Sequence, residues 1–323
     1  MLDQQDDGGQ GALNSSSTIE APIAPDELGH AVLTPSGAFE AGSWQTFTLV
    51  YTCGKYGMDD SASMRVCFRF ASDQSRPQFD DPKWRNYTTV VASNNAVLET
   101  RYDPKGNVRP WDRALYIKVV KGFMKEGDTI TITFGETSGG SQGVRLQTFC
   151  EDSFEFRVLV DPIATANYQA LPEQPVIRIV PGKPVTFAAV VPTARCVGET
   201  FALKIKGEDT WGNPSDQCDV TFAVKSSRPV TGLPDSVTLA PGAFAKVVEG
   251  LSVDGPGLVQ IWFEDASGAE VFRANPLCIQ KHLDLKPYWV DLHGQSEETI
   301  GTGTARAFFE FARDRAFVDA AGH

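Results

Sequence analysis

The sequence lacks the features that would direct it to a membrane or through one. No stretch approaches the roughly 18 to 20 continuous apolar residues that a membrane span requires. The first 20 residues contain neither the basic segment nor the apolar segment of a secretory signal. We therefore expect a cytoplasmic protein that does not bind membranes, an expectation that a leader upstream of residue 1 would reverse.

Positive charge is also scarce. Lys and Arg number 29 against 41 Asp and Glu, which gives a formal net charge of −12 and a sequence pI of about 4.8. An acidic chain repels phosphate backbones, and no Lys- or Arg-rich run offsets that repulsion. Nucleic acid is therefore not an expected partner.

Cysteine motifs are missing as well. The six cysteines never occur with C-x-x-C spacing, which excludes zinc-ribbon and thioredoxin-like motifs. In a cytosolic chain the pattern predicts buried free thiols. Cys67 lies on the same face of its strand as Arg65 and Arg69, so we expect it to be more exposed than the other five.

Alternation of apolar and polar residues dominates what is present. The run 64–70 alternates without exception, and runs at 47–51, 130–134 and 154–160 repeat the pattern. Period-two alternation between Gly, Pro, Asp and Asn turns is typical of half-buried antiparallel strands. Many short strands with few helical segments predict sandwiches. We expect a mainly β chain with two consecutive antiparallel β-sandwich (immunoglobulin-like) domains.

Changes in composition divide the chain into four parts. Residues 1–34 are rich in Asp, Gly, Ser and Gln, which predicts a disordered lead-in. We place the first sandwich at 35–163 and the second at 164–283, with a Pro-punctuated crossing between them. Residues 284–323 have a different pattern and form the fourth part.

That fourth part predicts a strand, a helix and a second strand. Residues 286–293 and 316–323 have strand character, and the segment 304–316 has apolar residues at helical spacing. The apolar positions are Ala305, Phe308, Phe309, Ala312 and Ala316. Thr304 is the expected cap of the helix. Strand, helix and strand in so few residues predict a βαβ unit with two parallel strands and a right-handed crossover.

The ends of those two strands carry candidate metal ligands. His293 ends the first strand and His323 ends the second, so parallel pairing brings both to one edge of the sheet. Asp291 and Gln295 flank His293 at spacing two, on the same face of the strand if it continues through them. Two imidazoles with nearby amide and carboxylate oxygens suit a divalent cation. The plainer alternatives are a chance H-x-Q and a terminal histidine left by cloning.

Two further acidic residues follow, Glu297 and Glu298. In the metal interpretation they lie around the metal ligands and orient them. In the plainer interpretation they are solvated loop charges. Nothing in the sequence assigns a catalytic residue, since there is no G-x-S-x-G elbow and no histidine lies within the strand runs of either sandwich.

The stretch "PYWVDLHGQSEETIGTGTARAFFEFARDRAFVDAAGH" resembles a bacterial domain family of unknown function, which is in turn similar to the PHP (polymerase and histidinol phosphatase) metal-dependent phosphoesterases. "YTCGKYGMDD", "VRPWDRALYIKV" and "EGDTITITFGETSGGSQGVRLQTF" extend the resemblance through the first sandwich. It implies that residues 284–323 are the first βαβ unit of a truncated PHP-like α/β barrel. His293 and His323 then match metal ligands, and Gln295 stands where such enzymes have a second histidine.

The resemblance also implies a function. The chain would be the N-terminal portion of a metal-dependent hydrolase, possibly a phosphoesterase, and too short to be active alone. The sandwiches would be accessory domains, the cofactor a divalent ion (Zn, Mn, Mg or Ca), and the substrate of the full-length protein a small molecule or ester. Gln295 favours harder ions over zinc, because a neutral amide is a weak zinc ligand.

A second hypothesis is a non-catalytic binding module for polysaccharide or protein. Trp84, Tyr87, Trp111 and Trp211 fall in or near expected loops, and aromatic faces stack on sugars. The alternative is that these aromatics pack at corners or cover the core. The two hypotheses differ in where they place the site: at the strand ends of residues 284–323, or on the loops of the sandwiches.

Overall fold

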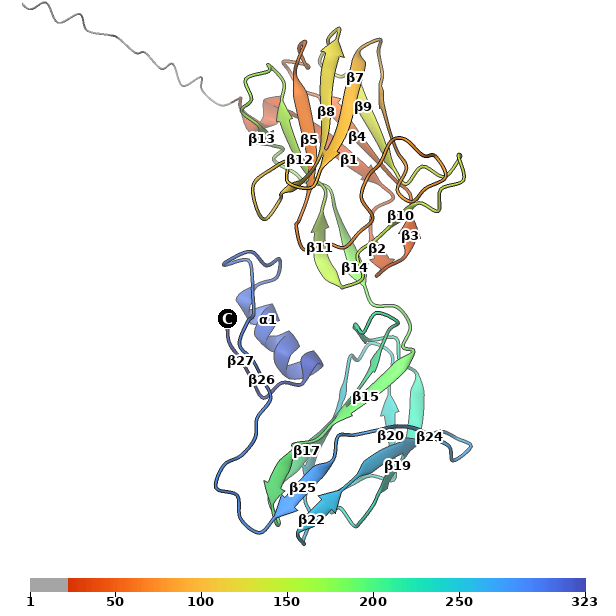
Figure 1. The fold of residues 1–323 in the computed structure, drawn as a ribbon, viewed down its shortest axis with the longest axis vertical. Coiled ribbons are helices and arrows are strands. Elements are labelled where there is room, and N and C mark those ends of the chain that lie inside the picture. Colours follow the sequence, from red (N-terminus) through yellow and green to blue (C-terminus); the bar gives the residue numbers. More distant parts are fainter. Residues whose placement is uncertain (1–22) are drawn as a thin grey trace, which may run out of the picture.

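A computed structural model describes residues 23–323, so most of the expected disordered lead-in lies outside the described residues. The described chain is mainly β and contains several sheets (Figure 1). It begins with the short 3₁₀ helix η1 (Pro25–Glu27). Residues 29–34, which the sequence assigned to the lead-in, form a strand. None of the helices within residues 23–323 combines the length and apolar character needed to cross a membrane.

The first sandwich has two principal sheets (Figure 1). One has the order β1-β4-β9-β6, with β1 (Gly29–Thr34), β4 (Phe47–Cys53), β6 (Thr88–Ala92) and β9 (Thr129–Phe134). The other has the order β13-β12-β5-β8-β7, with β5 (Ser63–Phe68), β7 (Val97–Asp103), β8 (Arg113–Lys121), β12 (Arg157–Asp161) and β13 (Gln169–Ala170). Smaller sheets pair β3 (Trp44–Gln45) with β10 (Val144–Arg145), and β14 (Val176–Val180) with β11 (Glu151–Glu155) and β2 (Ala38–Glu40).

Alternation correctly predicts the core of this sandwich. Phe47, Leu49 and Tyr51, which the pattern places on one face, are all 0% exposed. Phe156 lies at the centre of an aromatic cluster with ring-centroid distances of 5.3 to 5.7 Å to its neighbours Phe47, Phe68, Phe134 and Phe154. Burial of such rings stabilises the sandwich by about 25 cal/mol per Å² of apolar surface.

The second sandwich is built in the same way. One sheet joins β17 (Phe201–Glu208) to β15 (Thr186–Val190), β18 (Pro214–Ser215) and β21 (Lys246–Leu251), and another has the order β20 (Ser236–Leu239), β19 (Val220–Ser226), β23 (Ile261–Glu264), β24 (Glu270–Arg273). A third contains β16 (Ala194–Cys196), β25 (Leu277–Gln280) and β22 (Gly257–Val259). In the core of the second sandwich the rings of Phe263 and Phe272 stack, with their centroids 4.3 Å apart.

Two details differ from the expected architecture. The sandwiches are not wholly antiparallel, because β14 pairs with β2 in parallel and β16 pairs with β25 in parallel. The first hydrophobic core runs from Leu28 to Ile179 and the second from Ala189 to Ile279. The first core therefore extends past both ends of the expected 35–163 span, because β1 and β14 add their inward side chains to it.

The loop 208–217 of the second sandwich contacts the first sandwich. It turns at Gly212, which has a φ of 84°. Trp211 lies directly against Gly42 of the first sandwich, where a Cβ would come within 2.4 Å of the indole Nε1. Asn213 Nδ2 donates to the Thr148 carbonyl oxygen at 2.9 Å. The junction is therefore a packed and hydrogen-bonded contact.

The C-terminal segment, residues 284–323, contains the predicted strand, helix and strand. β26 (Val290–Asp291) pairs in parallel with β27 (Ala320–Ala321), with Val290 opposite Ala320. Between them, α1 (Ala305–Phe311) continues into the π-helix η2 (Ala312–Ala316). Thr304 Oγ1 accepts from the Ala307 N–H at 3.1 Å, which confirms the cap. The strands are two residues long, much shorter than expected.

Candidate functional site

The structure places the predicted metal residues at one edge of the parallel pair, but it does not gather them into one cluster. His293 Nε2 lies 3.5 Å from Gln295 Nε2. His323 Nε2 lies instead 2.5 Å from Ser296 Oγ, and its ring packs near the rings of Phe308 and Phe309. The two histidines therefore follow neighbouring strand ends and have different hydrogen-bonding partners.

These residues do not by themselves fit a divalent metal centre. Among residues 23–323 no group of three or more His, Cys, Asp or Glu side chains is placed to hold a metal ion. Asp291 Oδ1 already accepts from the backbone N–H of His293 at 2.9 Å. Gln295 Oε1 accepts from the Thr299 hydroxyl at 2.6 Å. Even with the second carboxylate oxygen of Asp291, the two imidazoles give fewer than the four or more ligands that a divalent ion takes.

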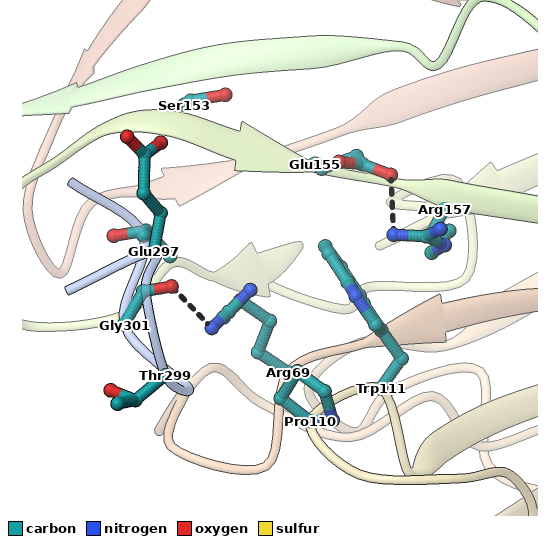
Figure 2. A pocket seen from close by; sticks show the side chains of 10 residues that line it. Arg69, Pro110, Trp111, Ser153, Glu155, Arg157, Glu297, Thr299 and Gly301 are labelled. Atoms are coloured by element: carbon teal, nitrogen blue, oxygen red, sulfur yellow. Dashed lines mark hydrogen bonds and ion pairs between the residues drawn. The ribbon is translucent and has the colours of Figure 1, made fainter. Parts of the chain in front are cut away.

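A cavity of about 320 Å³ lies where the loop 297–302 meets the first sandwich (Figure 2). We call it the seam pocket. Its lining comes from four separate parts of the chain: Arg69, Pro110, Trp111, Ser153, Glu155, Arg157, Glu297, Thr299, Gly301 and Thr302. The lining is polar, with hydroxyl, carboxylate and guanidinium groups around one indole ring. The volume is at the lower end of the range for small-molecule sites.

Trp111 lies between two arginines in this pocket (Figure 2). The guanidinium carbon of Arg69 is 5.1 Å from the ring centroid and that of Arg157 is 4.9 Å away. Both distances are within the range of a cation–π contact. The ring therefore packs near both arginines and is part of the pocket lining.

Arg69 holds the loop of the C-terminal segment against the sandwich (Figure 2). Its Nη2 donates to the carbonyl oxygens of Ile300 and Gly301, the latter at 2.8 Å. Burial lowers the pKa of Arg69 from its ordinary value, although the neighbouring Glu151 and Glu155 carboxylates oppose that shift. One wall of the seam pocket is thereby fixed by a charged donor on two backbone carbonyls.

Glu155 is the carboxylate that the pocket leaves unsatisfied. Its Oε1 is buried and has no hydrogen-bond partner within the described residues. Arg157 Nη1 is 3.8 Å from that oxygen, beyond hydrogen-bonding distance. Burial raises the pKa of Glu155, and Arg157 and Arg69 only partly counteract it. An unpaired buried acceptor costs roughly 1–3 kcal/mol, so it marks a position where a ligand hydrogen bond would be favourable.

Hydrogen bonds connect the pocket to the histidine edge. Thr299, which lines the pocket, donates to Gln295 Oε1, and Gln295 lies beside His293. Ser296 is 0% exposed and contacts His323, and the next residue is Glu297 of the pocket lining. Of the two acidic residues that the sequence suggested around a metal, Glu297 lines the seam pocket and Glu298 does not.

The other loop aromatics are divided between packing and exposure. Trp211 contacts the first sandwich at the junction, with Arg145 at 5.7 Å from its ring, and is still 47% exposed. Tyr87 is half-buried, and its carbonyl oxygen accepts from the Glu136 N–H at 2.8 Å. Trp84 is 59% exposed and lies near Arg85.

The expectation for Cys67 is wrong. Its thiol is 0% exposed, and burial raises its pKa to about 12. Cys67 does share the outer face of its sheet with Arg65 and Arg69, but that face is itself covered. Arg65 lies over the Tyr168 ring at 3.6 Å, and Arg157 is the cross-strand neighbour of Cys67. All six cysteines are free, and only Cys150 is exposed.

Comparison with known proteins assigns no family to the chain. No family model matches the sequence, and no curated protein matches it. The solved structures that resemble it include the Yersinia pseudotuberculosis adhesin InvE (12% identity, TM-score 0.24), the Escherichia coli adhesin FdeC (11%, 0.23) and a collagen adhesin from S. aureus (8%, 0.24).

These matches cover 78%, 79% and 79% of this chain, and 58%, 65% and 94% of the respective structures. The chain thus spans less than two thirds of the first two. At TM-scores this low, the likenesses support no conclusion about function. The resemblance to PHP enzymes gains no support from them.

Proposed function

We propose that this chain is a β-sandwich binding protein that takes a small, hydroxyl-rich ligand of the saccharide class in the seam pocket. The observation that carries the proposal is the unpaired, buried Oε1 of Glu155 in a polar cavity of about 320 Å³. The ligand would supply the missing donor. This is the binding-module hypothesis with its site moved from exposed aromatics to the seam between the first sandwich and the C-terminal segment.

The pocket offers the groups that recognise hydroxyls. Glu155 and Glu297 are acceptors, while Ser153, Thr299 and Thr302 both donate and accept. Sugars carry donor and acceptor on every hydroxyl, so such a lining matches several of them at once. A pocket that satisfies its polar groups only with a matched ligand also rejects apolar molecules of similar size, because those would leave the groups unpaired.

The test is calorimetric titration of the whole chain with a broad panel of mono- and disaccharides. Glu155→Leu removes the acceptor and places an apolar side chain in the cavity, so we expect it to abolish any binding. The matched control is Glu99→Leu, which changes an exposed glutamate of β7 far along the sequence from the pocket. Absence of heat across the panel would reject the proposal.

A metal-dependent hydrolase is the second candidate, favoured by the placement of His293 and His323 directly after two parallel strand ends. These two imidazoles would need further ligands to hold a divalent ion. Metal content after dialysis against Zn²⁺, Mn²⁺, Mg²⁺ or Ca²⁺ is the appropriate measurement. Lower metal content in His293→Ala than in the parent, with His282→Ala unchanged, is the expected result. Equal metal content in all three would dismiss this candidate.

A further inference from the structure

We propose that the ligand of the seam pocket carries a carboxylate, as a uronic acid does, and that the guanidinium of Arg157 binds it. The inference rests on the proposed function, because it specifies which class of saccharide the same cavity takes. It is carried by a difference between the two arginines that flank Trp111.

Arg69 commits one terminal nitrogen of its guanidinium to the protein. Its Nη2 donates to the Ile300 and Gly301 carbonyl oxygens, so its charge fixes the loop. Arg157 has no comparable partner: its guanidinium forms no hydrogen bond with another residue in the range 23–323, and its nearest carboxylate oxygen is 3.8 Å away. Both arginines lie on the same indole ring and line the same cavity. Of the two, Arg157 is therefore the one whose guanidinium makes no hydrogen bond to the described residues and is wholly available to a ligand.

The geometry of Arg157 suits a carboxylate. Its contact with the Trp111 ring orients the planar guanidinium, and its side chain is 35% exposed on the cavity side of β12. A guanidinium held in this way presents two parallel N–H groups, which match the two oxygens of a carboxylate. Because stacking restricts the side chain before the ligand arrives, less conformational entropy is lost on binding.

The charges around the cavity favour one negative charge over two. Arg69 and Arg157 face Glu155 and Glu297, so the four groups cancel when all are ionised. A carboxylate monoanion adds one negative charge to this balanced set, whereas a phosphate dianion would add two and would face Glu155 and Glu297 without enough positive charge to neutralise it.

The experiment compares glucuronate and galacturonate with glucose and galactose by titration calorimetry of the whole chain. We expect each uronate to bind about 10- to 100-fold more tightly than its neutral parent, the range expected for a hydrogen bond to a charged group. Arg157→Met should remove that preference. Arg157→Lys should restore little of the preference for uronates, because a lysine ammonium lacks the two parallel N–H donors of a guanidinium. Arg178→Met is the control, since Arg178 is exposed and paired with Asp152 at 3.3 Å.

Each other outcome is informative. Equal affinity for uronates and neutral sugars would overturn the role of Arg157 while leaving saccharide binding intact. Tighter binding of glucose 6-phosphate than of glucuronate would also overturn it. No binding of any saccharide would reject both this inference and the proposed function. If Arg157→Met fails to fold, as judged by circular dichroism, the Arg157→Lys comparison and the uronate preference of the parent chain still decide the matter.

Discussion

The C-terminal segment contacts the two sandwiches in different ways. On the first sandwich its loop 297–302 borders a polar cavity, held by Arg69 on two carbonyl oxygens. On the second, Phe317 is 5% exposed, with Lys204 and Lys206 Nζ at 5.6 and 5.3 Å from its ring. Trp289 Nε1 donates there to the Thr193 hydroxyl at 3.2 Å. We call these the polar seam and the packed seam.

The two seams have different roles: the packed seam supports the C-terminal segment, and the polar seam has the groups for ligand recognition. The packed seam buries an aromatic ring and leaves a cavity of about 110 Å³ beside it, whereas the polar seam leaves about 320 Å³ with an unpaired carboxylate oxygen. Burial of a Phe side chain stabilises by roughly 1.5–3 kcal/mol without specifying a ligand. Unpaired polar groups destabilise the empty site and gain partners from a ligand. The packed seam therefore anchors the segment that completes the polar one.

Phe317→Ala should give the largest effect. Loss of a buried ring costs roughly 3–5 kcal/mol, and here the loss weakens only the attachment of residues 284–323. Because Phe317 has a positive φ of 64°, alanine keeps the same backbone cost and isolates the side chain. Hydrogen exchange should accelerate by about a hundredfold or more in α1 and be unchanged in β4 and β9.

The control for this variant is Phe311→Ala, which removes a ring that is 44% exposed on the same helical segment. Phe311→Ala should leave the hydrogen-exchange rates in α1 nearly equal to those of the parent chain. Unchanged exchange in Phe317→Ala would mean that Trp289 or the Lys286–Glu199 ion pair holds the segment instead. Accelerated exchange throughout both sandwiches would mean that the segment is not a separate cooperative unit.

Arg69→Met should have an intermediate effect, confined to the polar seam. Hydrogen bonds from a charged donor contribute about 1.5–3 kcal/mol, so the amides of residues 297–303 should exchange roughly 10- to 100-fold faster. The contacts of Phe317 should persist. Arg109→Met is the matched control, because Arg109 lies over the Phe70 ring at 4.7 Å but is mostly exposed. Equal acceleration in both variants would remove Arg69 from the role of loop anchor.

Much of the fold follows from local pattern. The alternation in 47–51 identifies the inward residues of β4, and the helical spacing after Thr304 identifies α1 with its cap. The parallel pairing of β26 with β27 follows from the short strand-helix-strand order. These features succeed because each depends on neighbours within a few residues, where periodicity states which face is buried.

The seam pocket could not be predicted in that way. Its lining joins residues near 69, 111, 155 and 300, and no local period relates those positions. Alternation places Arg69 and Cys67 on the outer face of β5 but cannot state that this face is covered. The same limit explains why Trp111 and Trp211, expected in or near loops, prove to be flanked by arginines or packed at a junction.

The metal hypothesis is limited by the same physics. Strand ends predict that His293 and His323 lie at one edge, which the parallel register supports. Whether the two histidines form one metal site then depends on their side-chain partners. Ser296 contacts His323, and Gln295 contacts His293 and Thr299. A sequence can state which residue types lie near one edge of a sheet. Which hydrogen bonds their side chains make depends on the whole fold.

Glu155→Gln should give the smallest effect and should sharpen the contrast between the seams. The pKa of Glu155 is raised in the folded chain, so the folded state binds the proton more tightly than the unfolded state does. The stability of the parent therefore falls as the pH rises from the ordinary value near 4.5 through the raised one. Glutamine stays neutral, so the variant should lose less stability over that window.

The fall should be small in the parent and should not vanish in the variant. Arg157 and Arg69 offset part of the burial cost at Glu155, and the pKa of Glu151 is raised in the same direction by burial. Glu99→Gln, on an exposed glutamate of β7, should follow the parent's profile. Urea unfolding at several pH values measures all three, and identical slopes for parent and Glu155→Gln would mean that Glu155 is solvated and paired in solution. The polar seam would then lack the unsatisfied group on which ligand binding depends, and the two seams would differ in composition but not in function.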